Sequence, residues 1–291
     1  MCLVAIAVDA HPRIALVLAA NRDEYHARSA APAAWGREGA FRDVLAGRDL
    51  MAGGTWLGVR RDGRFALVTN VREGKAQDPA ANSRGELPLL ALHADRTIDE
   101  AMAAIDAPRY NGFNLLAGDA AGFLWMTNRD AEIELPAALR ASGLIRPRER
   151  PFGQTRRVTR GVHGLSNALL DVQWPKVART QERLQSWLRG DATSFEPLFD
   201  ALGDRAQATD AELPSTGVPL AWERLLSSPF IVSDRYGTRC STVLAVDRGG
   251  HARFVERTFA PDGAPSHEVA VEFDLTARAA VPSPGAESRL R

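Results

Sequence analysis

The 291-residue sequence predicts an α+β fold built on largely antiparallel sheets. Apolar β-type runs gather towards both ends of the chain, and patterns typical of helices lie between and after them. Short turn sequences join neighbouring runs, which favours hairpins over the crossover helices of βαβ units. No repeat at a solenoid period interrupts this pattern. We expect one domain over residues 1–276, followed by a polar C-terminal tail over residues 277–291.

The first two strands are expected at the N-terminus. Residues 2–8 and 14–20 are β-type runs separated by a turn-like stretch that contains Pro12, so they predict an antiparallel pair. The sequence Asn-Arg-Asp-Glu follows the second run directly, at residues 21–24. Polar side chains at the end of a buried strand are a common place for a functional site.

The middle of the chain mixes hairpins and helices. Residues 28–44, rich in Ala, Arg and Pro, are expected to be irregular. Asp62-Gly63 lies between two β-type runs and is a strong hairpin signal. A capping-box spacing from Ser83 to Glu86 starts one helix. Further elements are expected as a helix at 97–105 and a hairpin formed by 111–117 and 123–128.

The C-terminal half adds a helix and a third hairpin. Residues 136–160 predict an exposed connection, and a short strand should follow at 162–167. Lys176–Leu188 is an amphipathic helix whose apolar face includes Val177 and Leu184. The remaining expected strands are 240–246 and 252–259, joined by a turn, and an edge strand at 269–273.

Composition and charge exclude several classes of function. Lys and Arg together number 36, as do Asp and Glu, so the net charge is zero and a nucleic-acid partner is not expected. The apolar runs are too short to span a membrane, so no integral membrane association is expected. Two cysteines make no disulfide framework, which favours a cytoplasmic location. The six histidines show no paired zinc spacing, and we expect no metal.

Cys2 is the residue with the most specific chemistry. If Met1 is removed, the thiol and the free α-amine of Cys2 form a nucleophile with its own base. An internal cysteine lacks that amine. The alternative is that Cys2 is simply the start of a buried strand, since cysteine is often fully buried.

Short motifs spread along the chain carry a resemblance to a known family. They occur in order from residue 1 to about residue 260: Met1-Cys2-Leu3, Asn21-Arg22-Asp23-Glu24, Gly47-Arg48-Asp49, Gly53-Gly54-Thr55-Trp56, Thr69-Asn70-Val71-Arg72, Tyr110-Asn111-Gly112-Phe113-Asn114, Ser166-Asn167, Trp174-Pro175-Lys176 and Tyr236-Gly237-Thr238-Arg239. With these motifs the sequence resembles the NRDE family, which is transport and Golgi organization protein 2-like. The family in turn resembles the N-terminal nucleophile hydrolases.

The resemblance implies a fold, an activity and a set of site residues. The implied fold is a four-layer αββα sandwich of two antiparallel sheets with helices outside. The implied activity is cleavage of a small or acyl-type amide by an N-terminal cysteine. The implied catalytic residues are Cys2, Arg22, Asp23, Asn70, Asn167 and Arg239. One departure stands out: Arg22 and Asp23 are adjacent, and adjacent side chains on a strand point to opposite faces, so both can face Cys2 only if the backbone bends.

Each of these residues has a role in the hydrolase reading and a structural alternative. Arg22 or Arg239 would favour the thiolate, and Asp23 would hold the α-ammonium. Asn70 would donate to the developing oxyanion, and Asn167 would orient the amine or the substrate carbonyl. In the alternative, Arg22 and Asp23 form a structural ion pair and Arg239 pairs with Asp234. The asparagines then satisfy backbone groups in turns.

A second hypothesis is a binding or trafficking protein that keeps the hydrolase fold without hydrolysis. The resemblance connects the family with haem, lipid or acyl-CoA handling, so the ligand would be a small or hydrophobic molecule. We expect four residues to contact it: Asn21, Trp56, Asn114 and Trp174. No cofactor is required by the hydrolase reading, and haem is considered only as a ligand. The sequence does not specify an oligomeric state.

Overall fold

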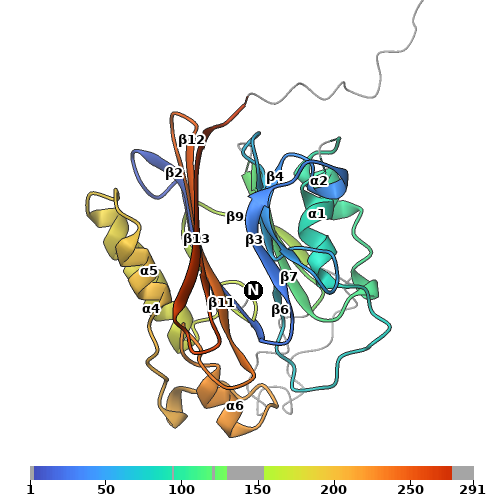
Figure 1. Ribbon diagram of the computed structural model, residues 1–291, viewed down its shortest axis with the longest axis vertical. Coiled ribbons are helices and arrows are strands. Elements are labelled where there is room, and N and C mark those ends of the chain that lie inside the picture. The colour runs from blue at the N-terminus through green and yellow to red at the C-terminus, as the bar shows by residue number, and fades with distance from the viewer. Residues whose placement is uncertain (1–2, 94, 120–121, 130–153, 277–291) are drawn as a thin grey trace, which may run out of the picture.

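The protein folds as two antiparallel sheets that face each other, with helices on the outer side of each (Figure 1). The computed structural model describes residues 3–93, 95–119, 122–129 and 154–276. The first sheet has the strand order β10-β1-β2-β11-β12-β13 and the second the order β3-β4-β5-β6-β7-β8-β9. The predicted four-layer αββα sandwich of antiparallel sheets is therefore confirmed.

The strands of the first sheet come from both ends of the chain and join in space. They are β1 (Leu3–Val8), β2 (Ile14–Tyr25), β10 (Gly161–Leu165), β11 (Tyr236–Asp247), β12 (His251–Phe259) and β13 (Pro265–Asp274). The predicted N-terminal pair and the predicted C-terminal hairpin are both present, and β2 and β11 pair along most of their length. The strand β2 runs on to Tyr25, so Asn-Arg-Asp-Glu lies within the strand and not after it.

The second sheet is built mainly from the middle of the chain. Its strands are β3 (Ala30–Trp35), β4 (Val44–Asp49), β5 (Leu57–Arg60), β6 (Phe65–Asn70), β7 (Phe113–Asp119), β8 (Gly122–Thr127) and β9 (Gln154–Val158). Gly63, at a φ of 83°, forms the predicted turn between β5 and β6.

Two segments expected to lack regular structure form strands at the edges of the second sheet. Residues 28–44 contain β3, and the expected connection at 136–160 contains β9. The strand β3 holds Pro32, which cannot donate a ladder hydrogen bond and is tolerated at an edge. Neither segment shows the apolar alternation that is typical of a central strand. An edge strand pairs with one neighbour only, so its sequence pattern is less constrained.

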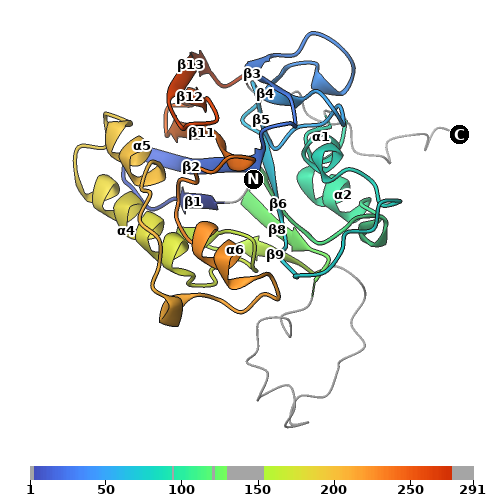
Figure 2. The same cartoon turned by 60° about the horizontal axis from the view of Figure 1, so that its bottom comes forward.

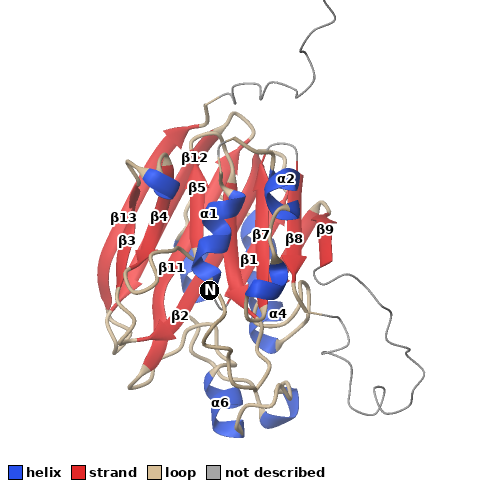
Figure 3. Ribbon diagram, turned by 90° about the vertical axis from the view of Figure 1, so that its right-hand side faces the viewer, coloured by secondary structure: helices blue, strands red, loops and turns tan. Residues whose placement is uncertain are grey.

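Helices cover both outer faces (Figures 2 and 3). The helices α1 (Leu87–Ala91) and α2 (Ile98–Ala103) pack on the second sheet, and α4 (Pro175–Arg189) and α5 (Glu196–Leu202) pack on the first. The short helix α6 (Leu220–Leu225) precedes β11. Val177, Leu184 and Leu188 of α4 are buried, as the amphipathic pattern predicts.

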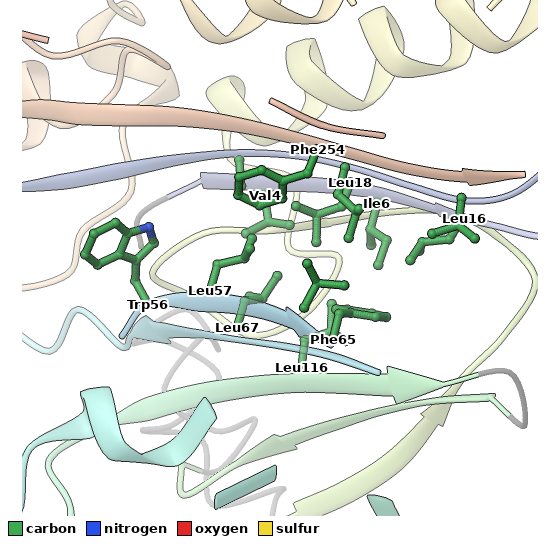
Figure 4. Packing of buried hydrophobic residues seen from close by; sticks show 14 of the residues in the cluster. Val4, Ile6, Leu16, Leu18, Trp56, Leu57, Phe65, Leu67, Leu116 and Phe254 are labelled. Carbon is green, nitrogen blue, oxygen red and sulfur yellow. The ribbon is translucent and has the colours of Figure 1, made fainter. Parts of the chain in front are cut away.

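The main core lies between the two sheets. Strand alternation sends Ile6 and Leu18 inward, where they meet Leu67 and Leu116 of the facing sheet (Figure 4). The opposite faces of the same strands, including Ala5 and Val17, pack under α4 and α5. This two-sided burial fixes which side chains of β2 and β11 can face the space between the sheets.

Candidate functional site between the sheets

A cavity of about 170 Å³ lies between the sheets at one end of the core. Five of its wall residues carry chemistry: Arg22 from β2, Arg239 and Cys240 from β11, Glu256 from β12, and Trp56. The other wall residues are Ala30, Ala31, Pro32, Thr258, Phe259 and Ser266. Trp56 stands at the end of the row of aliphatic core side chains in Figure 4. The cavity brings together three residues expected from the sequence, Arg22, Trp56 and Arg239.

Arg22 and Asp23 occupy opposite faces of β2. Arg22 shares a face with the inward-pointing Leu18, and its guanidinium carbon lies 4.4 Å from the centre of the Trp56 ring. Asp23 accepts a hydrogen bond of 2.6 Å from the hydroxyl of Thr238. β2 does not bend to bring both side chains into the cavity. Arg22 and Asp23 therefore point to opposite faces, as expected for adjacent residues on a strand.

The pairing of β2 with β11 is irregular opposite Arg22. Thr238 pairs with Asp23 and Cys240 pairs with Arg22, which leaves Arg239 as one extra residue on β11. Such a β-bulge re-aims the side chains on either side of it. As a result the adjacent residues Arg239 and Cys240 both line the cavity. No motif in the sequence indicated this bulge.

The Arg22 side chain is buried, with only 4% exposed. Its nearest acid is Asp49, whose carboxylate oxygen lies 4.0 Å from Nη2. That oxygen accepts a 2.6 Å hydrogen bond from Arg28, and the second oxygen accepts from two backbone amides after Asp49. Burial alone would raise the pKa of Asp49, but these hydrogen bonds outweigh it and hold the pKa below its usual value. The Nη1 atom of Arg22 is buried and has no hydrogen-bond partner among the residues that the structure describes.

Arg239 reaches the cavity from the bulge. Its Nη1 donates to the backbone carbonyls of His26 and Tyr25, at 3.0 Å and 3.4 Å. The expected ion pair with Asp234 does not form among the described residues, and the buried Nε of Arg239 has no hydrogen-bond partner. Burial and the neighbouring charge of Arg22 lower the pKa of Arg239 from its ordinary value. Both guanidinium groups therefore contribute positive charge to the same small cavity.

Glu256 and Cys240 also line the cavity, although neither was among the site residues expected from the sequence. Glu256 is 1% exposed and accepts from the backbone amide of Ala33 at 2.7 Å and from the hydroxyl of Thr242 at 3.3 Å. Burial raises its pKa. Burial, with the carboxylate of Glu256 beside it, raises the pKa of the Cys240 thiol well above its usual value. The only sequence signal for Glu256 was its position as a lone acid among the inward-facing residues of the run 252–256.

Asn70 and Asn167 lie together at the end of the sandwich where β6 and β10 finish. The side-chain amide of Asn167 donates to the backbone carbonyl of Asn70 at 3.0 Å. The backbone amide of Arg72 donates in turn to the carbonyl of Asn167 at 2.8 Å. Arg72 also stacks on the ring of Trp174, 4.8 Å from its centre, and pairs with Glu223 at 2.7 Å. None of these residues lines the cavity that holds Arg22.

The remaining two expected ligand contacts have structural partners. Asn21 is fully buried on the face of β2 opposite to Arg22; its amide donates to the carbonyls of Leu202 and Pro229, and its oxygen accepts from Ser241. Asn114 is fully buried between β6 and β8, where it donates to Thr69 and to the carbonyl of Ala168 and accepts from the Trp125 indole at 3.2 Å. Their role in ligand contact stays a prediction.

Cys2 lies outside the described residues, and so does the tail at 277–291. The first described residue, Leu3, pairs with Asn21 in the register of β1 and β2, which puts it next to Arg22 along the neighbouring strand. Among the described residues, no group of three or more His, Cys, Asp or Glu side chains is arranged to hold a metal ion. Of the helices that these residues form, none has the length and apolar character needed to span a bilayer.

Fold and site together define an αββα sandwich with a cavity between its sheets that two arginines line. The sequence matches the family model of Transport and Golgi organisation 2 over residues 1–261. The chain is a member of that family.

Its relatives include homologues of Transport and Golgi organization protein 2 from animals. The Bos taurus homologue is 32% identical over 282 residues and the Homo sapiens homologue 30% identical over 276, each match covering 89% of this chain and 93% of the relative. Among solved structures, it is similar to a Caenorhabditis elegans N-acylethanolamine-hydrolyzing acid amidase orthologue, at 8% identity and a TM-score of 0.41, over 84% of this chain and 92% of that one. It is also similar to a conjugated bile acid hydrolase from Clostridium perfringens, at 10% identity and a TM-score of 0.43, over 94% and 97% of the two chains.

Proposed function

We propose that the protein is an N-terminal cysteine amidohydrolase that cleaves the C–N bond of a small or acyl-type amide. The observation that carries the proposal is the pair of guanidinium groups, Arg22 and Arg239, that line one cavity between the sheets near the start of β1. Cys2 is bonded to Leu3, the first residue of β1. A thiol near guanidinium cations has a lowered pKa and a larger thiolate fraction.

The proposed reaction uses the free α-amine that removal of Met1 creates. The α-amine takes the proton of the Cys2 thiol, and the thiolate adds to the carbonyl carbon of the amide. The C–N bond then breaks, and the leaving amine takes the proton from the α-ammonium. Water attacks the resulting thioester, which releases a carboxylic acid and restores the thiol.

The other residues have proposed roles that follow their positions. Asn70 donates its side-chain amide to the oxyanion, and the hydrogen bond from Asn167 to the Asn70 carbonyl supports this because it holds the end of β6 in place. Asp23 lies on the face of β2 opposite to Arg22, so in this proposal it holds the α-ammonium while Arg22 acts on the thiol; the burial of the Asp23 carboxylate supports that role. Cytoplasmic location remains part of this proposal, because a free thiol nucleophile needs reducing conditions.

Two measurements test the proposal. The intact mass of the protein should show loss of Met1, and a panel of acyl amides should be turned over by the native chain but not by Cys2→Ala. A matched pair of tagged proteins provides the control: an N-terminal extension turns the α-amine into an amide and should abolish turnover, whereas the same extension at the C-terminus should not. Equal turnover in Cys2→Ala and native protein would contradict the proposal.

A second candidate function, binding of an acyl chain, is supported by a larger pocket. About 550 Å³ in volume, it lies at the opposite end of β2 and β11, and its walls combine apolar residues such as Val8, Leu16 and Phe123 with charged residues such as Asp9 and Arg248. Leu16 and Arg22 are six positions apart along β2, which corresponds to about 20 Å. None of the described wall residues is a His, Cys or Met, so the pocket offers no usual axial ligand and does not fit haem as a coordinated group.

Equilibrium dialysis with a labelled acyl-CoA tests this second function. Saturable binding that Phe123→Ser weakens, and that Arg22→Gln leaves intact, would support it. An unchanged acyl-CoA affinity in Phe123→Ser would contradict it.

A further inference from the structure

The cavity between the sheets has hydrogen-bond donors without acceptors. Three buried N–H groups on its walls have no hydrogen-bond partner within the described parts of the chain: Nη1 of Arg22, Nε of Arg239 and Nε1 of Trp56. The Arg22 side chain is 96% buried, since 4% is exposed. A buried donor left without a partner destabilises the fold, and more so when it is charged. Such a set is stable when a ligand supplies the missing acceptors.

The acids near the cavity accept hydrogen bonds from groups other than the two arginines of its wall. The Asp49 oxygen closest to Arg22 accepts from Arg28 at 2.6 Å, and its other oxygen accepts from backbone amides. Glu256 gives one oxygen to the backbone amide of Ala33 and the other to Thr242. Among the described residues, no acid accepts a hydrogen bond from the guanidinium of Arg22 or of Arg239. Two cations thus face the cavity with their charge only partly balanced.

The size of the cavity limits what can enter. A volume of about 170 Å³ corresponds to roughly five or six water molecules. This is enough for a carboxylate with a few further heavy atoms. Guanidinium groups match carboxylate geometry through paired N–H donors, and the Trp56 indole adds a third donor.

From these observations we propose that the substrate carries a carboxylate, which binds between Arg22 and Arg239 beside the indole of Trp56. The inference rests on the proposed hydrolase function, because it names the substrate class of the same site: an amide with an anionic carboxylate a few bonds from the scissile C–N bond. The carboxylate belongs either to the amine part or to the acyl part of the substrate.

The experiment measures binding without turnover, in the full chain with Cys2→Ala. Calorimetric titrations compare N-acetylglycine, whose carboxylate is on the amine side, and succinamate, whose carboxylate is on the acyl side, with N-acetylglycinamide, which is neutral. We expect one of the two anions to bind about tenfold to a hundredfold more tightly than the neutral amide. Which anion binds identifies the side of the substrate that carries the carboxylate.

Variants locate the binding site. Arg22→Gln and Arg239→Gln should each remove most of this preference for the anion, and Arg239→Gln, at a partly exposed position, keeps the test valid if the Arg22 variant does not fold. Arg235→Gln, an exposed arginine that does not line the cavity, is the matched control and should bind as the parent does.

Two results would overturn the inference. One is equal affinity for the neutral amide and both anions; the other is an anion preference that survives both cavity substitutions. Because binding is measured in Cys2→Ala, it separates this inference from the proposed reaction. Anion binding with no turnover of either anionic amide by the native chain would refute the reaction and leave the carboxylate site standing.

Discussion

The guanidinium of Arg22 stacks on the indole of Trp56, with 4.4 Å between the guanidinium carbon and the ring centre. The contact links the first sheet to the facing sheet, because Arg22 belongs to β2 and Trp56 directly precedes β5. A cation over an aromatic face contributes about 1–2 kcal/mol when both groups are buried.

We expect Trp56→Leu to lower the free energy of unfolding by about 2–4 kcal/mol, since it removes both the buried ring and the stacking. Trp56→Phe keeps an aromatic face and should lose less. Urea denaturation followed by circular dichroism measures both variants. Equal losses in the two would show that the stacking contributes nothing.

Substitutions at Asn70 and Asn114 should affect different properties, activity for Asn70 and stability for Asn114. Asn114→Ala leaves the Ala168 carbonyl and the Trp125 indole without a partner and should cost about 2–3 kcal/mol in the free energy of unfolding. If the proposed reaction is correct, Asn70→Ala should lower kcat about 10²–10³-fold with little change in stability.

Thermal unfolding and acyl-amide turnover, measured on both variants, check this contrast. A stable Asn114→Ala protein that has lost ligand affinity would instead support a ligand contact for Asn114, as the sequence suggested.

The two cysteines should differ sharply in reactivity. Burial raises the pKa of the Cys240 thiol, so it is protonated and shielded near neutral pH. We expect iodoacetamide at pH 7.5 to modify Cys2 in the folded protein and Cys240 only after unfolding. Peptide mass spectrometry with and without urea measures the sites. Modification of Cys240 at the rate of Cys2 in folded protein would contradict the buried position.

The pair His163–Asp171 should make stability depend on pH. The ring Nδ1 lies 2.9 Å from the Asp171 carboxylate, and this hydrogen bond raises the pKa of His163 above 6.5. The folded state therefore holds the proton more tightly than the unfolded chain. This stabilisation is fully present below pH 6.5 and is lost as the pH rises through the folded-state pKa.

We expect His163→Gln to lower the free energy of unfolding by about 0.5–1 kcal/mol at pH 5.5, with solvent screening of the half-exposed Asp171 taken into account, and by less at pH 8.5. Denaturant titrations at the two pH values measure the difference. A loss that grows with pH would contradict the assigned sign.

Glu256 predicts a second pH dependence in a different window. Its pKa in the fold is raised by burial, so its contribution to stability is present below pH 4.5 and is lost as the pH rises through the folded-state pKa. Glu256→Gln keeps an acceptor for the Ala33 amide and has no charge to bury. The variant should therefore gain stability relative to the native chain as the pH rises from 4 to 8. Urea unfolding across that range checks the trend, and parallel curves would refute it.

Local patterns in the sequence determined much of the sandwich. The turn at Asp62-Gly63, the amphipathic face of α4 and the apolar alternation of β1, β2, β11 and β12 each depend on residues near one another in the chain, so propensity and periodicity identify them. Strand alternation alone also separated Arg22 from Asp23. The resemblance to the NRDE family implied the layer order, which local patterns alone do not specify.

Tertiary pairing alone decided the candidate site. Arg239 reaches the cavity because a bulge forms where β11 meets β2, and Glu256 joins Arg22 there from a strand more than 200 residues away. The edge strand β3 closes the same wall although its residues carry little strand signal. Register, bulges and edges arise from long-range contacts, which no local pattern records. The sequence by itself identified Arg22 and Arg239 as candidate site residues, and only the packing of the two sheets brought both to the wall of one cavity.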